Sequence, residues 1–128
     1  MDTIKITATT RSPEIEFNFT DNTYLIKGES YPEDVSAFYS PLMDKVESHL
    51  RGLKGAIINF RFELVYFNSS TAKILMRLFE LLESAATKGN QARITWVHEE
   101  DDDNVKELGE EFAEELEHAQ FVIEEITV

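Results

Sequence analysis

The sequence has 128 residues, 42% of them hydrophobic, and a formal net charge of −13 from 25 acidic and 12 basic residues. This hydrophobic content excludes a disordered chain, and the length fits a single domain, which we place at residues 1–128. Because cysteine is absent, disulfides, thiol nucleophiles and thiolate metal sites are excluded as well.

The two ends of the sequence set further limits. Residues 1–5 have neither the basic start nor the apolar stretch of a secretory signal, and no run approaches membrane-spanning length, so we expect a cytoplasmic protein. Residues 99–128 contain 13 of the 25 acidic residues and one basic residue, Lys106. Such a surface repels phosphate backbones, which argues against nucleic-acid binding. It either attracts a basic protein surface or forms a solvated acidic face, and we favour the solvated face.

The first elements are predicted to be strands. Ile4 and Ile6 indicate a short first strand. Residues 14–20 then alternate between polar and apolar side chains, Asp21-Asn22 supplies a turn, and residues 23–27 have the pattern of a returning strand. Together these segments predict a β-hairpin.

A helix is predicted next. Ser30 and Glu33 have the spacing of a capping box, in which the Ser30 side chain accepts from an amide of the first turn and Glu33 reaches back. Apolar residues between Val35 and Leu50 then recur on one helical face. Pro41 interrupts this pattern because it removes a backbone hydrogen bond, so we expect a kink or a break near residues 37–40.

Residues 56–67 carry the strongest strand pattern in the sequence. The apolar side chains of this segment are predicted to share one face: Ile58, Phe60, Phe62, Leu64 and Tyr66. The other face carries polar side chains in its middle, so it should be in contact with water: Asn59, Arg61 and Glu63. A second amphipathic helix is predicted directly after Asn68, and Lys88-Gly89 is a suitable stop for it.

The remaining residues predict one more strand, helix and strand. Residues 93–98 form the first of these, and the carboxylates of residues 99–103 can cap the following helix, whose apolar face runs from Val105 to Leu116. Residues 121–128 form the final strand. The predicted order is therefore ββαβαβαβ. Strands that alternate with helices after a hairpin favour an α/β fold, with a mixed sheet and crossover helices.

The run from Tyr66 to Lys73 joins the strongest strand to the second helix and places Ser69, Ser70 and Thr71 at the helix N-terminus. Free backbone N–H groups and the positive end of the helix dipole favour an added phosphate there. Asn and Ser are also preferred N-cap residues, so an ordinary helix cap explains the same pattern. The two interpretations are compatible, because a cap and a phosphorylation site can share one turn.

Motifs for catalysis or cofactor binding are missing from the sequence. The glycines are too scattered for a phosphate loop, and the three histidines form no His-x-x-x-His pair. Ser69 and Ser70 lack a Gly-x-Ser-x-Gly context, and residues 101–103 lack the spaced ligands of a calcium loop. We therefore expect a protein that binds or is modified, with no cofactor and no specific metal, rather than an enzyme. A small metal-assisted hydrolase that uses the acidic segment is the alternative from another class.

Several stretches match one family in order along nearly the whole chain: Ser12-Pro13-Glu14-Ile15, Gly28-Glu29-Ser30-Tyr31-Pro32-Glu33, Phe38-Tyr39-Ser40-Pro41, Tyr66-Phe67-Asn68-Ser69-Ser70, Lys73, Thr95-Trp96 and residues 99–103. With them the sequence resembles the SiaC family of bacterial regulatory phosphoproteins, which belong to biofilm-linked signalling. The resemblance implies a fold like the STAS (SpoIIAA-like) domains of anti-sigma-factor antagonists. It also implies that Ser69 is the phosphorylated residue, because Ser69 occupies the position of a Thr that follows the Asn in the family.

The resemblance further implies a partner switch. A HATPase-type kinase would phosphorylate the protein, and a PP2C-type phosphatase would reverse the modification. The unmodified form would bind and activate a GGDEF diguanylate cyclase and so raise cyclic-di-GMP. An antagonist of an anti-sigma factor is the alternative that the same fold suggests.

A candidate partner surface surrounds the phosphorylation turn. A capping box needs Ser30 and Glu33 but gives no reason for Tyr31 beside Pro32, so we predict that this turn lies next to the Ser69 turn. The alternative is that Tyr31 packs on the helix as a hydrophobic staple. The residues assigned to binding or to supporting this surface are Tyr31, Pro32, Glu33, Tyr66, Asn68, Ser70, Thr71 and Lys73.

Overall fold

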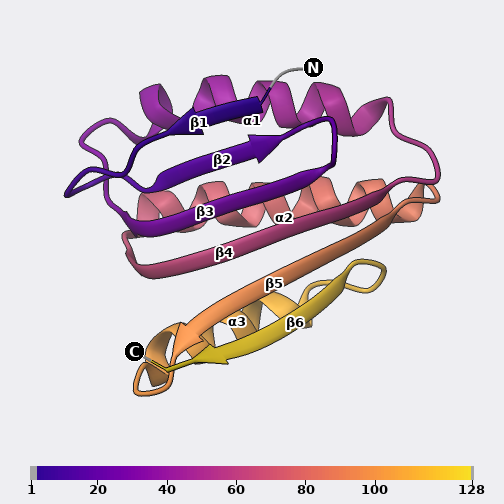
Figure 1. The fold of residues 1–128 in the computed structure, drawn as a ribbon. Coiled ribbons are helices and arrows are strands. Elements are labelled where there is room, and N and C mark those ends of the chain that lie inside the picture. Colours follow the sequence, from indigo (N-terminus) through magenta and orange to yellow (C-terminus); the bar gives the residue numbers. More distant parts are fainter. Residues whose placement is uncertain (1–2, 128) are drawn as a thin grey trace.

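The computed structural model describes residues 3–127. Within this part of the chain, six strands and three helices follow one another along the sequence (Figure 1). The strands are β1 (Thr3–Ile6), β2 (Glu14–Asn18), β3 (Thr23–Ser30), β4 (Ile57–Phe67), β5 (Gln91–Glu99) and β6 (Gln120–Ile126). The helices are α1 (Val35–Arg51), α2 (Ser69–Thr87) and α3 (Asp103–Glu114).

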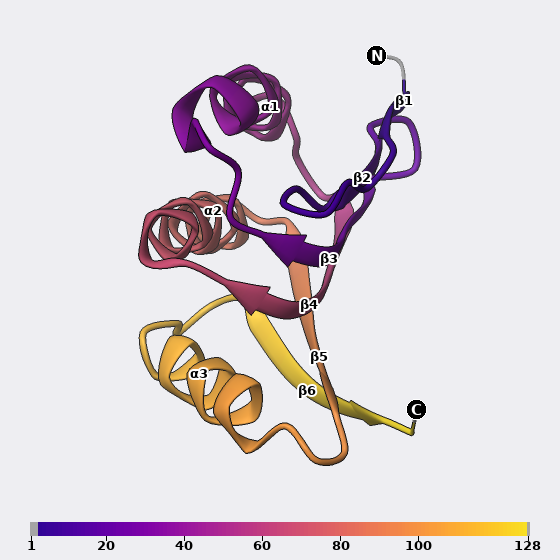
Figure 2. The ribbon, with the colours of Figure 1, turned by 90° about the vertical axis from the view of Figure 1, so that its left-hand side faces the viewer.

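The strands form one mixed sheet in the order β1-β2-β3-β4-β5-β6. The first three strands pair antiparallel, and β3 to β6 pair parallel through the crossover helices α1, α2 and α3. All three helices cover the same face of the sheet (Figure 2), because crossovers of one hand that add strands in one direction stay on one side. The predicted mixed sheet with crossover helices is confirmed, and the short strand at Ile4 and Ile6 precedes the hairpin as expected.

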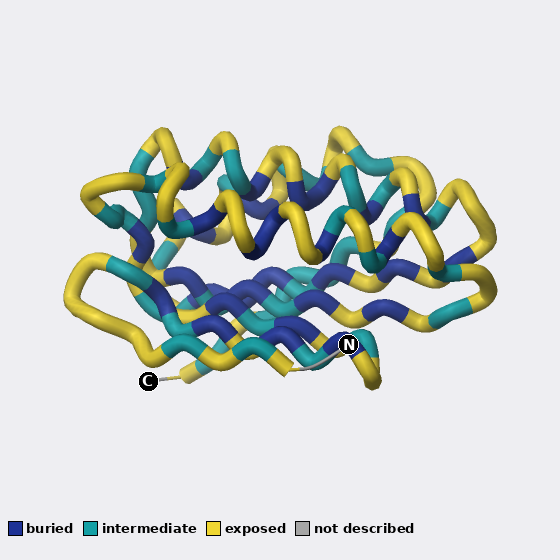
Figure 3. The backbone as a smooth tube through the Cα atoms, turned by 90° about the horizontal axis from the view of Figure 1, so that it is seen from above, coloured by how far each residue is buried: buried dark blue, intermediate teal, exposed yellow. Residues whose placement is uncertain are grey.

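The hydrophobic core lies between the helices and the covered face of the sheet (Figure 3). Ile58, Phe60, Phe62 and Leu64 are at most 2% exposed, as their alternation along β4 predicts. The Phe60 ring stacks on those of Tyr24 and Phe62 with centroids 5.1 and 4.7 Å apart. Burying side chains of this size contributes about 1.5–3 kcal/mol each to folding, so β4 anchors the fold.

The uncovered face of the sheet is polar in its middle. The Arg61 guanidinium contacts the carboxylates of Glu63 at 2.7 Å and Glu124 at 2.5 Å. Partly exposed ion pairs of this kind add little stability, but they keep this face compatible with water. The prediction of a solvated face along the middle of β4 is confirmed.

The start of α1 differs from the prediction. Ser30 is the last residue of β3 and is fully buried, and Glu33 lies before the helix. Asp34 is the N-cap instead, and its carboxylate accepts the N–H of Ala37 at 3.0 Å. The predicted capping box is therefore wrong, because the Ser30 hydroxyl is bonded to side chains of α1 and α2 that local spacing cannot reveal.

Of the kink or break predicted near residues 37–40, the break is wrong, because α1 runs without interruption from Val35 to Arg51, and the kink stays a prediction. Pro41 removes the hydrogen bond that would have reached the carbonyl of Ala37. Both Ala37 and Pro41 are exposed, so water can take the place of the missing donor. The helix tolerates the proline at this solvent-facing position.

A β-bulge at Val65 changes the face on which the last residues of β4 lie. Gly28 pairs with Leu64, but Glu29 pairs with Tyr66, so the alternation shifts by one residue. Phe67 consequently continues the covered face, with its ring 5.9 Å from that of Trp96. Tyr66 is 53% exposed, so the expectation that it shares the apolar face of β4 is wrong.

The C-terminal elements follow the predicted order. Asp102 caps α3 by accepting the N–H of Val105 at 3.1 Å, which confirms the capping role expected of the acidic segment. The final strand is β6, which begins one residue before Phe121, and Val128 lies outside the described residues. Within residues 3–127, no helix combines the length and the apolar character needed to cross a membrane.

Candidate functional site

The junction between β4 and α2 is a single capped turn. β4 ends at Phe67, and α2 begins at Ser69, as the sequence predicts. The side chain of Asn68 accepts the N–H of Thr71 at 2.9 Å, and the N–H of Asn68 donates to the carbonyl of Ser30 at 3.1 Å. The turn is therefore held from within by a helix cap and from outside by the end of β3.

The three hydroxyls of this turn have different surroundings. Thr71 is fully buried, and its hydroxyl donates to the carbonyl of Ser30 at 3.0 Å. Ser69 and Ser70 are exposed. An incoming phosphoryl donor can therefore reach Ser69 and Ser70 in the folded protein, whereas Thr71 supports the turn from inside.

A buried hydroxyl cluster lies directly under the turn. The Ser30 hydroxyl is 2.6 Å from the Tyr39 hydroxyl and 3.0 Å from that of Thr71. Burial raises the pKa of Tyr39 to about 12, against the smaller lowering effect of its hydrogen bond with Ser30. Tyr39 thus stays neutral near physiological pH, and the cluster ties β3, α1 and α2 together through satisfied hydrogen bonds.

The turn that contains Tyr31 and Pro32 lies beside the Ser69 turn. The ring of Tyr31 meets that of Tyr66 edge to face, with centroids 5.6 Å apart. On the α1 side, Pro32, Glu33, Asn68, Ser70 and Lys73 are among the residues that line one shallow hollow. The structure therefore brings together the two turns that the sequence analysis paired, and the ring partner of Tyr31 is Tyr66 at the end of β4.

Within α2 itself the charges near the N-terminus suit an added anion, although Glu33 and Asp34 line the hollow on the α1 side. The first turn of α2 has no acidic residue. Lys73 is exposed and lies four residues after Ser69, on the same side of the helix. The positive end of the helix dipole and a lysine one turn along both favour negative charge at this turn.

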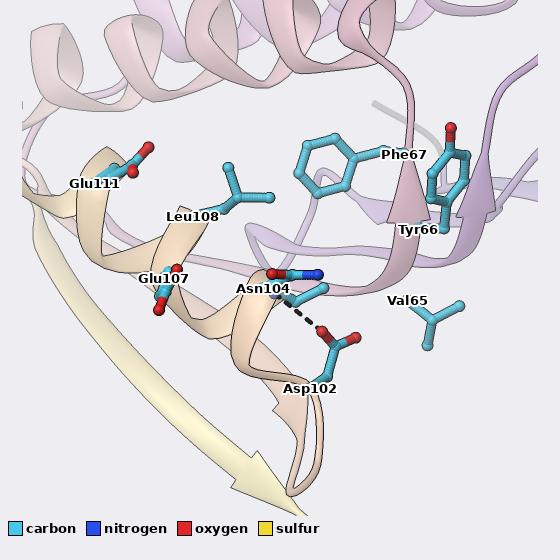
Figure 4. Close-up of a pocket in the computed structure, with 9 residues that line it drawn as sticks. Val65, Tyr66, Phe67, Asp102, Asn104, Glu107, Leu108 and Glu111 are labelled. Carbon is cyan, nitrogen blue, oxygen red and sulfur yellow. Dashed lines mark hydrogen bonds between the residues drawn. The ribbon is translucent and has the colours of Figure 1, made fainter.

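A second hollow, of about 500 Å³, separates the end of β4 from α3 (Figure 4). We call it the β4–α3 groove, and it is lined by Val65, Tyr66, Phe67, Asp102, Asn104, Val105, Glu107, Leu108 and Glu111. Of these residues, only Tyr66 is predicted from the sequence to belong to a binding surface. The available signal was the loss of alternation at Val65-Tyr66-Phe67, where three apolar residues follow one another.

The acidic C-terminal region offers no evident metal site in the described part of the chain. Among residues 3–127, no group of three or more His, Asp and Glu side chains is arranged to hold a metal ion. The expectation of no specific metal therefore stays a prediction that a titration must test.

Comparison with known proteins identifies the family. A sequence profile described as SiaC family regulatory phosphoprotein matches residues 6–126. The chain belongs to the SiaC family. A SiaC-family protein is a regulatory phosphoprotein and not itself an enzyme, in agreement with the sequence analysis. An uncharacterized protein of Pseudomonas aeruginosa (strain UCBPP-PA14) is 30% identical over 116 residues, which cover 90% of each chain.

Solved structures of SiaC share the fold of this family member. Apo-SiaC from Pseudomonas aeruginosa superposes with a TM-score of 0.84 and 28% identity, covering 97% of this chain and 99% of that chain. A second match comes from the crystal structure of the diguanylate cyclase SiaD in complex with its activator SiaC from Pseudomonas aeruginosa. It has a TM-score of 0.87 and 26% identity, and covers 96% of this chain and 99% of that chain.

Proposed function

We propose that this SiaC-family protein binds and activates a GGDEF diguanylate cyclase in the cytoplasm, and that phosphorylation of Ser69 releases the cyclase. A HATPase-type kinase adds the phosphate, and a PP2C-type phosphatase removes it. The observation that carries the proposal is the exposed Ser69 at the first position of α2, three residues after the exposed Tyr66. The likeness to a SiaC that activates a diguanylate cyclase supports the choice of partner.

Ser69 is favoured over its neighbours for physical reasons. Thr71 is buried, and its hydroxyl is already bonded to Ser30, so its phosphorylation would require the turn to open. Ser70 is exposed but lines the hollow between α1 and α2. Ser69 directly follows the N-cap Asn68, in the first turn, where free N–H groups stabilise an anion.

A phosphate on Ser69 that the fold tolerates would still weaken a complex formed on this turn. Phosphorylation adds about −1.5 to −2 charges. At a helix N-terminus, an anion gains about 0.3–1 kcal/mol from the dipole, so the folded state is not harmed. An interface packed on this turn must desolvate the dianion, which costs several kcal/mol without a cationic partner. Since about 1.4 kcal/mol is tenfold in affinity, this cost is enough to release an ordinary partner.

The surface around Ser69 has the composition of a protein-binding site. Tyr31 and Tyr66 form an aromatic pair next to this turn, and aromatic residues are enriched among the side chains that carry most of the energy of an interface. Pro32 and Glu33 lie on one side of the pair, and Lys73 lies along α2. We assign these side chains to partner contact, with Asn68, Ser70 and Thr71 supporting the turn.

Mass spectrometry of the protein after incubation with its cognate kinase and ATP tests the site. We expect one phosphate on Ser69 in the wild type and in Ser70→Ala, and no phosphate in Ser69→Ala. Both variants should stay folded, because Asn68 still caps α2. A phosphate on Ser70 would overturn the residue assignment, and an unmodified turn would overturn the regulatory switch.

A further inference from the structure

We propose that the β4–α3 groove holds a basic, partly apolar segment of the activated partner, with apolar side chains on its floor and Lys or Arg side chains against its rim. This inference rests on the proposed function, because the segment belongs to the cyclase. It extends the partner surface from the Ser69 turn to α3, a region that the sequence analysis treated as a solvated face.

The groove exists because β4 and β5 separate. Their ladder ends where Phe62 pairs with Trp96, although β4 continues to Phe67. α3 stands beside the opening, with Val105 held by the indole N–H of Trp96, which donates to its carbonyl at 2.8 Å. Tyr66 and Phe67 therefore keep their β3 partners on one side, and residues 65–67 line the groove on the other.

The floor of the groove is apolar and accessible. Val65 is 44% and Tyr66 is 53% exposed, and both belong to the four large hydrophobic residues that stay exposed within residues 3–127. Phe67 and Leu108 are half-buried beside them and point into the space between β4 and α3 (Figure 4). An exposed apolar surface in a hollow with a polar rim is typical of a protein-binding site.

The rim of the groove is acidic and uncompensated. Asp102, Glu107 and Glu111 all contribute from the α3 side, and the groove lining contains no Lys or Arg. Glu107 and Glu111 are exposed, and neither takes part in an ion pair among the described residues. One carboxylate oxygen of Asp102 caps α3, so Glu107 and Glu111 supply the charge that is free to attract a partner.

The negative charge of the rim determines which class of partner can bind in the groove. A second copy of this chain, with a net charge of −13, an anionic membrane and a nucleic acid are all repelled by an acidic rim. A segment that pairs cations with apolar side chains complements both the rim and the floor. Complementary charge of this type mainly speeds association, whereas apolar contact mainly slows dissociation.

The groove and the phosphate should therefore act on different rates. A phosphate on Ser69 adds negative charge, which does not slow the approach of a basic partner, but its desolvation weakens the assembled complex. We expect phosphorylation to raise the dissociation rate. Removal of the charges on the rim should lower the association rate instead.

Charge reversal on α3 provides the test of the rim. Glu107→Lys with Glu111→Lys changes the groove, while Glu110→Lys with Glu114→Lys makes the same change at exposed positions of the same helix outside the groove lining. Association of each variant with the purified cyclase is followed by stopped flow at low and high salt. We expect the groove pair to lower the association rate about tenfold at low salt and to flatten its salt dependence, and the control pair to have a clearly smaller effect.

Substitution of exposed apolar residues on β4 tests whether the floor of the groove contacts the partner. Val65→Ser should raise the dissociation rate of the cyclase complex about tenfold. Ile57→Ser, which alters a 60% exposed residue at the other end of β4, should leave it unchanged. Circular dichroism confirms that each variant is folded before it is measured.

The outcomes separate this inference from the proposed function. If the wild type binds the cyclase but the groove variants behave like their controls, the groove assignment is wrong and the switch at Ser69 stands. Equal effects of the two Glu pairs would likewise overturn it, because they would reflect net charge alone. If the wild type does not bind the cyclase under any of these conditions, the proposed function fails, and the inference fails with it.

Discussion

The hydroxyl of Thr71, on the first turn of α2, donates a 3.0 Å hydrogen bond to the carbonyl of Ser30, which lies 41 residues earlier at the end of β3. This bond and the Asn68 N–H, which donates to the same carbonyl, fasten the candidate phosphorylation turn to the neighbouring strand. The position of Ser69 is thus set by buried contacts, while its own hydroxyl stays at the surface.

Thr71→Val should destabilise the protein by about 1–2 kcal/mol, because it keeps the shape of the side chain but removes a buried hydrogen-bond donor and leaves Ser30 less satisfied. Urea unfolding measures the change. Ser70→Ala removes an exposed hydroxyl from the same turn and should change stability by less than about 0.5 kcal/mol. Equal unfolding midpoints for the two variants would show that the buried cluster does not hold the turn.

Gly109→Ala should destabilise the protein by about 1–3 kcal/mol. A Cβ at this position would lie 2.3 Å from Cδ1 of the Trp96 ring, which α3 covers. This overpacking should outweigh the gain in helix propensity of about 1 kcal/mol. Gly52→Ala is the control, because its added Cβ would meet the His49 carbonyl at an ordinary 3.8 Å. Urea unfolding of Gly109→Ala that is unchanged or shifted to higher midpoints would mean that α3 is not packed on Trp96 as described.

Glu83 on α2 should stabilise the connection between α3 and β6 in a pH-dependent way. Its carboxylate accepts the N–H groups of residues 117, 118 and 119. Burial acts to raise the pKa of Glu83, but the hydrogen bonds from Ala119, His118 and Glu117 outweigh it and lower the pKa from 4.5 to about 2. Because the pKa of Glu83 is lower in the folded state, its carboxylate stabilises the fold above about pH 4.5. This contribution is lost as the pH falls toward 2.

Glu83→Gln should therefore lower the thermal midpoint at pH 7, by the equivalent of about 1 kcal/mol, and the difference from the wild type should shrink as the pH is lowered below 4.5. Glu80→Gln, at an exposed position of the same helix, is the control. A difference between Glu83→Gln and the wild type that is constant from pH 7 to pH 3 would contradict the role assigned to this carboxylate.

Calorimetric titration with Ca²⁺, Mg²⁺ and Mn²⁺ should detect no binding tighter than millimolar, because the acids of the C-terminal region lack the arrangement of a coordinating site in the described residues. One tight, stoichiometric site would revive the metal-assisted hydrolase as a function of this chain.

Much of the fold follows from local patterns in the sequence. The alternation in β4 and the helical period of α2 place Ser69 at a helix N-terminus, because both patterns depend only on nearby residues. The capping-box prediction failed because the Ser30 hydroxyl bonds to Tyr39 and Thr71, which belong to other elements. Spacing along the chain cannot distinguish a serine that caps a helix from one buried at the end of a strand.

The surface features that local sequence patterns did not predict depend on the pairing between strands. Tyr66 is exposed because a bulge at Val65 shifts its register against β3. The β4–α3 groove opens because the pairing of β4 with β5 stops at Phe62. Neither point is fixed by local sequence, since both are set by where neighbouring strands begin and end. The acidic residues Glu107 and Glu111 were visible, but only the folded chain places them beside Val65 and Tyr66.

The central claim is tested most directly by the activity of the diguanylate cyclase itself. The rate of cyclic-di-GMP synthesis is measured with the unmodified protein, with protein phosphorylated by the cognate kinase, and with phosphorylated protein treated with the phosphatase. We predict activation, loss of activation and recovery, in that order, while Ser69→Ala activates throughout. Equal activation by the phosphorylated and unmodified forms, or no activation by either, would contradict the account.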